Sequence, residues 1–258
     1  MKTLVKILVG IVGAIALAFA AIFYFKADMV GIADDFFLAM KDKNVDTAYS
    51  YLSDDFKAGT SEVELLAYME KNQLVSFEEA NWQTRSINGG RGDLVGSIST
   101  TSGGVVPIAL SFVKGQDGWK IYAIQKPNSG LQTESAEVQI PSEEDQVQLV
   151  RESMHVFAVA VNERSMTKFH AHTSRLWQQQ FSVEDLDQAF GAFYELGADL
   201  TILDNYSPRF DSTASFDEDG FLLIAGHYPT KPNQVQFEQK YIFEGLGWKL
   251  AGFSANIN

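Results

Sequence analysis

The chain has 258 residues, of which 46% are hydrophobic and 12% aromatic; this composition is that of a folding chain and excludes an intrinsically disordered one. It contains no cysteine, which excludes a disulfide framework, a thiolate metal site and a cysteine nucleophile. The formal net charge of −13 argues against a nucleic-acid-binding protein, because binding to phosphates needs a basic surface.

The N-terminal part of the chain has the pattern of a membrane anchor. Residues 7–25 form an apolar run without a charged side chain, and a helix of that length spans about 28 Å, close to the thickness of the hydrocarbon core. Lys2 and Lys6 precede this run and Asp28 follows it. The positive-inside rule therefore places the N-terminus in the cytoplasm and the remainder outside. We predict a single-pass signal anchor in a bacterial inner (cytoplasmic) membrane, with extracytoplasmic C-terminal domains.

A cleaved signal peptide is the alternative for the same segment. Ala18-Phe19-Ala20 is a small-x-small triplet of the kind that is cleaved, which would leave Ala21 as the new N-terminus. The apolar run continues to Phe25, however, where a signal peptide has normally become polar. The pattern favours a retained anchor, and both alternatives export the rest of the chain.

The rest of the chain shows one pattern twice, which indicates an internal repeat. Trp119 and Trp248 each open a strand after a glycine-marked turn. Ser61 and Ser182 each begin a capping box before a helix, at an offset of 121 residues. The offset is 129 at the two tryptophans, so the second copy has a longer middle loop. Further matches at the first offset are Phe36 with Phe157, Phe56 with Trp177, Tyr49 with His170 and Tyr51 with His172, and Gly96 corresponds to Gly226 in a later strand.

The pattern divides the chain into four parts. We expect a cytoplasmic tip and membrane helix over 1–27, an α+β domain over 28–126, a linker over 127–145 and a second α+β domain over 146–258. In the first domain the periodicity predicts three helices and then four antiparallel strands. The predicted helices cover about 28–42, 44–56 and 61–73, and the strands lie near 78–87, 92–101, 104–114 and 119–126.

This order of elements resembles the nuclear transport factor 2-like superfamily of cystatin-like α+β cones. The resemblance rests on an aromatic-rich first helix, a short second helix with Ala48-Tyr49 and Leu52, and a closing Gly-Trp-Lys strand. It implies two tandem domains, each with helices packed on a curved antiparallel sheet, and these follow the transmembrane helix predicted from the apolar run. The superfamily includes isomerases, dehydratases, ligand binders and structural subunits, so the resemblance selects no function.

Four side chains in the second domain are candidates for a ligand-binding interior. His227 shares the strand parity of apolar neighbours, and Gln239 shares that of Phe237 and Tyr241. Polar groups on an apolar strand face could line the cone. With an acid such as Asp211, His227 would be a general base for an isomerase or dehydratase. A hydrogen-bonded structural histidine is the alternative.

Other motifs have structural explanations. His170 and His172 point about 200° apart on a helix, so they do not chelate one metal ion. Arg91-Gly92-Asp93 spells an adhesion tripeptide within a turn-forming segment, and the turn accounts for it. We therefore expect no catalytic residue, no metal site and no cofactor.

Three functional hypotheses remain, in order of preference. The first is a non-catalytic interaction or scaffold protein of the bacterial envelope, held in the membrane by residues 7–25 and bound to an envelope protein. The second is a carrier or sensor of a small apolar ligand that uses the domain cones. The third is an isomerase or dehydratase that uses the second domain.

Overall fold

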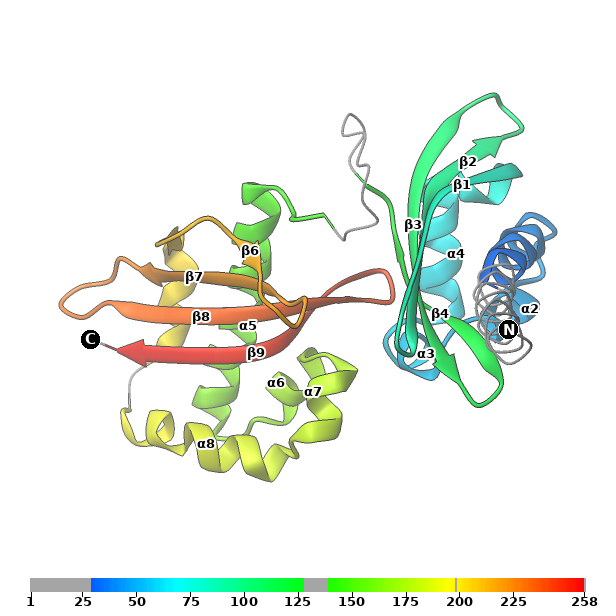
Figure 1. Cartoon of the computed structure of the whole chain (residues 1–258). Coiled ribbons are helices and arrows are strands. Elements are labelled where there is room, and N and C mark those ends of the chain that lie inside the picture. The colour runs from blue at the N-terminus through cyan, green and yellow to red at the C-terminus, as the bar shows by residue number, and fades with distance from the viewer. Residues whose placement is uncertain (1–28, 128–138, 198, 258) are drawn as a thin grey trace, which may run out of the picture. The chain divides into compact units, whose positions relative to one another are not determined.

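The computed structural model describes residues 29–127, 139–197 and 199–257 (Figure 1). The chain forms two compact units, unit 1 (Met1–Val138) and unit 2 (Gln139–Asn258). The predicted anchor, residues 7–25, lies outside the described residues. Among the residues that are described, no helix has the length and apolarity needed to cross a membrane.

The helices of unit 1 precede its sheet, as predicted. The first helix, whose described part covers 29–41, is followed by α2 (Val45–Ser50), α3 (Asp54–Gly59), α4 (Glu62–Lys71) and the 3₁₀ turn η1 (Leu74–Ser76). The single helix predicted over 44–56 is wrong, because the chain leaves the helical path between α2 and α3. There Leu52 forms a parallel bridge with Ile121, and Ser53 N–H donates to the Ile121 carbonyl over 2.9 Å.

Side-chain caps explain where these helices begin. Ser53 Oγ accepts a hydrogen bond from Phe56 N–H at the start of α3. Ser61 and Glu64 form the predicted capping box at the start of α4, since each side chain accepts from the other residue's backbone N–H. Such a cap satisfies donors that have no partner within the helix.

The sheet of unit 1 has four antiparallel strands in sequential order. They are β1 (Phe77–Asn88), β2 (Arg91–Thr100), β3 (Val105–Gly115) and β4 (Gly118–Gln125). Arg91 follows the β1–β2 turn and opens β2. The Asp93 carboxylate accepts hydrogen bonds from Ser86 Oγ and Ser111 Oγ on the neighbouring strands, at 3.1 and 2.9 Å. The aspartate of the tripeptide is therefore part of the sheet.

Unit 2 repeats this order of elements. Its helices are α5 (Glu143–Glu163), α6 (Thr167–His172), α7 (Arg175–Gln180), α8 (Val183–Glu195) and the 3₁₀ helix η2 (Leu200–Asn205). Its antiparallel strands are β5 (Arg209–Phe210), β6 (Ser215–Phe216), β7 (Leu222–Tyr228), β8 (Val235–Glu244) and β9 (Gly247–Ile257), with β5 and β6 both paired to β7. Helix α5 begins inside the segment predicted as a linker, 127–145, because Ser142 caps its first turn. Helices that precede an antiparallel sheet make both units α+β, which confirms the predicted class.

Local backbone features recur at corresponding positions of the two units. Lys43 and Arg164, 121 residues apart, both have positive φ, of 57° and 53°. The register shift between Ser111 and Phe112 in unit 1 has a counterpart at Lys240 and Tyr241 in unit 2. The parallel bridge of Leu52 to Ile121 is matched by Thr173 to Leu250.

The predicted match of Tyr49 with His170 is also present in the contacts. Tyr49 Oη donates to the Thr60 carbonyl over 2.7 Å. His170 Nε2 lies 2.8 Å from the Phe181 carbonyl, and Phe181 is 121 residues beyond Thr60. Because a carbonyl only accepts, Nε2 carries the proton and donates. We call this contact the donor clamp of each unit.

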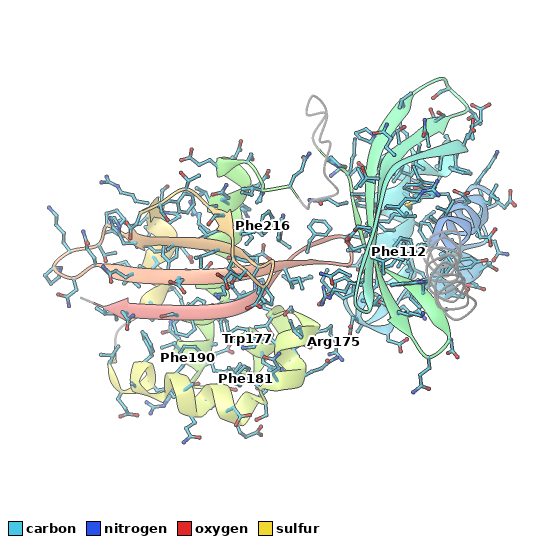
Figure 2. All side chains as sticks on the ribbon, in the orientation of Figure 1. Phe112, Arg175, Trp177, Phe181, Phe190 and Phe216 are labelled. Carbon is cyan, nitrogen blue, oxygen red and sulfur yellow. The ribbon has the colours of Figure 1, made fainter. Side chains whose placement is uncertain are left out.

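Aromatic rings fill the space between helices and sheet in unit 2. Phe157 of α5 contacts Phe169, Phe190, Phe193 and Phe253, with ring centroids 4.6–5.4 Å apart. Trp177 and Phe190, labelled in Figure 2, pack on Phe169 at 6.0 Å. Aromatic packing of this kind stabilises a core through buried area and ring geometry.

Candidate functional site

Three of the four predicted ligand-binding residues lie in the core of unit 2. Phe237, Gln239 and Tyr241 alternate along the buried face of β8, and their relative exposures are 4%, 0% and 1%. Tyr241 Oη bonds with Gln239 Oε1 and lies 3.1 Å from Ser153 Oγ of α5. Tyr241 therefore joins the sheet to the first helix of the unit.

The polar contacts continue from Ser153 to a buried histidine. Ser153 Oγ lies 3.4 Å from His172 Nε2, and burial lowers the pKa of His172. Burial also raises the pKa of Tyr241. Both shifts favour the neutral form, so this network is uncharged near neutral pH. Gln239 Nε2 has no hydrogen-bond partner among the described residues, which is costly for a buried donor.

His227 lies on the opposite face of the sheet from Gln239. On β7 the buried positions are Leu222, Ile224, Gly226 and Tyr228. Ile224 pairs with Gln239, whereas His227 pairs with the exposed Gln236. The predicted arrangement of His227 and Gln239 around one interior is therefore wrong. Apolar residues occupy both parities of this strand, so alternation alone could not decide between the two faces.

His227 lies beside Asp211, the acid considered above as an example of its partner. His227 Nδ1 lies 2.8 Å from Asp211 Oδ1, and the side chains are 24% and 53% exposed. A carboxylate accepts, so Nδ1 donates and Nε2 of the neutral ring keeps its lone pair. This arrangement suits a general base, but it lies on the outer sheet face. His155 and Asp204 form a second exposed pair, also at 2.8 Å.

The two histidines of α6 have separate partners. His170 contacts the Phe181 carbonyl, whereas His172 contacts Ser153. Within the described ranges, no group of three His, Cys, Asp or Glu side chains is placed to hold a metal ion.

Sequence analysis missed a groove in unit 1, beside the first helix. Its volume is about 440 Å³, and it lies between the start of that helix and the edge strand β1. The groove is lined by Val30, Asp34, Glu79, Ala80, Asn81, Trp82, Arg85 and Ser99. Val30, Asp34 and the buried Phe37 are four and three residues apart, which places them on one face of the helix. That spacing, which places an acid on the apolar face, was the signal in the sequence.

Asp34 is the partly buried charged group of this groove. Trp82 Nε1–H donates to Asp34 Oδ1 over 3.1 Å, and the Trp82 side chain is 8% exposed. Burial raises the pKa of Asp34, while the Trp82 hydrogen bond acts in the opposite direction. Asp35 raises the pKa further, and Arg85 lowers it. The site therefore has an incompletely compensated carboxylate at its wall.

Comparisons with known proteins assign no family to this chain. No protein-family model matches it, and no curated protein does. Among solved structures, it is similar to a cystatin-like protein from Ruminococcus gnavus ATCC 29149, with 11% sequence identity and a TM-score of 0.30. The similarity covers 92% of this chain and 92% of that chain.

Proposed function

We propose that this protein is a non-catalytic interaction module of the bacterial envelope, tethered to the inner membrane by residues 7–25. The observation that carries the proposal is the structural role of Phe237, Gln239 and Tyr241 in the core of unit 2. All three are buried core residues, and Tyr241 bonds across the core to Ser153. Their burial, and the bond of Tyr241 to Ser153, support a structural role for them rather than a catalytic one.

The proposal includes an origin by tandem duplication, followed by divergence. It is supported by the shared order of elements, the paired register shifts and the donor clamp at Tyr49 and His170. Two α+β units behind one anchor present a large surface to other envelope proteins. The net charge of −13 favours partners with basic segments.

The location is testable because the natural chain has no cysteine. We would introduce Gln116→Cys in the exposed β3–β4 turn and, separately, Thr3→Cys before the apolar run. In intact spheroplasts, a membrane-impermeant maleimide is expected to label the first variant and to spare the second. Labelling at both positions, or only at the second, contradicts the proposed topology.

The activity is tested on the full chain, purified from its host in mild detergent and analysed by native mass spectrometry. A stable complex with another envelope protein is expected. A clean mass for the protein alone, in cross-linked and untreated membranes alike, would count against an interaction module.

A small-ligand carrier is the second candidate, and Gln239 is the observation that favours it. Its Nε2 is a buried donor without a partner among the described residues. A bound small molecule with an acceptor would satisfy it. Release of such a molecule on denaturation, lost in Gln239→Leu, would move the assignment to the carrier.

A further inference from the structure

The first helix carries different charged groups in the two units. At the offset of 121 residues, Val30 and Asp34 of the helix over 29–41 correspond to Arg151 and His155 of α5. The buried neighbours correspond as well, since Met29 matches Val150 and both are fully buried. The same helix face thus carries an acid in unit 1 and basic groups in unit 2.

In unit 2 a segment of the chain itself covers this face. Arg151 donates from an Nη to the Asp204 carbonyl over 2.8 Å, and His155 Nδ1 lies 2.8 Å from Asp204 Oδ2. Asp204 belongs to η2, which is anchored by Leu200 and Leu203, at 5% and 3% exposure. The basic helix face therefore has an acidic segment bound to it.

In unit 1 the corresponding connection is shorter, and the groove lies beside the same helix face. The offset between the two units is 121 residues at the capping boxes. It is 128 residues between Asn81 and Arg209, which correspond because their carbonyls approach Gly96 and Gly226 in the same way. Unit 1 thus has seven residues fewer between these two points, and three of the seven reflect the helix lengths, because α4 has 10 residues and α8 has 13. Its own turn there, η1, has 3 residues.

Asp34 faces this groove with one oxygen engaged. Oδ1 accepts from Trp82 Nε1, and Oδ2 has no hydrogen bond among the described residues. Asp34 and Glu79 contribute acidic groups and Arg85 a basic one. A cation placed at Asp34 would therefore find a half-buried carboxylate with an available acceptor.

We propose that the groove beside Asp34 binds a short segment of a partner polypeptide, which presents Lys or Arg to this carboxylate. The segment would cover the helix as η2 covers α5, with the charges exchanged: the helix supplies the acid and the segment the base. This inference rests on the proposed function and names the partner's chemistry at one site.

The chain's own linker does not have the required charge. Residues 128–138 contain Glu134 and Glu137 and neither Lys nor Arg. The groove is expected to lie near the bilayer, because Val30 is only five residues beyond the end of the apolar run. Five residues span at most about 18 Å, even when fully extended. With the proposed anchor in place, a partner segment bound in the groove would lie close to the membrane surface.

The test uses the full chain in detergent and two probe peptides, acetyl-Thr-Val-Lys-Val-Thr-amide and its counterpart with Glu in place of Lys. Calorimetric titration is expected to show at least tenfold tighter binding of the Lys peptide. Asp34→Asn should weaken that binding at least tenfold, since it removes the charge and keeps an acceptor for Trp82. Asp35→Asn, the same change at an exposed neighbour, should alter it less than twofold. Asp34→Lys should reverse the preference.

Hydrogen exchange locates the binding. Protection by the Lys peptide is expected in residues 30–34 and 79–85. Protection elsewhere, equal binding of the two peptides, or equal effects of Asp34→Asn and Asp35→Asn would each overturn the proposal. If the Lys peptide binds only after Lys26→Gln, the chain's own Lys26 competes with the peptide for the groove. That result would also overturn the proposal. A native envelope complex that persists in Asp34→Asn, beside failed peptide tests, would refute this inference alone and leave the proposed function standing.

Discussion

Replacing Gly226 by alanine tests the close approach of β5 to β7. An added Cβ at Gly226 would lie 2.1 Å from the Arg209 carbonyl oxygen and 2.9 Å from Phe237 Cζ. Real Cβ atoms keep about 3.4 Å from such an oxygen, so the carbonyl must move by about 1 Å. It cannot move freely, because Arg209 and Phe210 pair with His227 and Gly226. Overpacking of this kind costs about 1–3 kcal/mol.

Gly191→Ala is the matched control, since it makes the same chemical change without a clash. Gly191 lies inside α8, and an added Cβ there has nothing within 4 Å. Alanine should stabilise the helix by about 0.5–1 kcal/mol. The free energies of unfolding of the two variants should therefore differ by roughly 1.5–4 kcal/mol.

The assay is urea denaturation of the full chain, followed by hydrogen exchange in peptides from β7 and β8. This readout separates unit 2 from unit 1. Gly96→Ala repeats the test in unit 1, where the added Cβ would lie 2.1 Å from the Asn81 carbonyl oxygen. If Gly226→Ala destabilises unit 2 no more than Gly191→Ala does, the close approach is refuted.

Four further changes test other parts of the structure. Tyr241→Phe should destabilise unit 2 by about 1–3 kcal/mol in urea denaturation, because it leaves buried partners unpaired; an unchanged midpoint would contradict this. Ser182→Ala should cost about 1 kcal/mol through loss of the α8 cap, measured in the same way. Burial lowers the pKa of His172 in the folded protein, so the unfolded state binds the proton more readily and stability falls as pH drops through about 6.5. His172→Gln should reduce that loss between pH 7.5 and 5.5. Burial raises the pKa of Asp34, so its charge weakens folding as pH rises, and Asp34→Asn should stabilise unit 1 at pH 7 by less than about 1 kcal/mol.

The order of elements followed from the sequence because its signals are local. The capping boxes at Ser61 and Ser182 act on backbone groups only three residues away, so each retains its meaning out of context. The break between α2 and α3 was missed because Leu52 leaves the helix for a bridge to Ile121. That partner is distant in sequence, and no local propensity encodes it.

The candidate site was predicted less well, for a related reason. The face on which His227 lies depends on pairing with β8, and both parities of β7 contain apolar residues. Asp211 lies beside His227 because it directly follows β5, which pairs with β7. The groove at Asp34 depends on how a helix meets an edge strand, which is a tertiary arrangement that strand parity does not describe.

The donor clamp shows which property of a side chain this position requires. Tyr49 and His170 perform the same task with a phenol and an imidazole, each donating to a carbonyl eleven residues further along the chain. The position therefore requires a hydrogen donor of suitable reach and no particular side chain. An imidazole there still donates after it gains a proton, since both ring nitrogens then carry hydrogen. Selection could therefore exchange a phenol for an imidazole at this position, and the fold would keep the same bond.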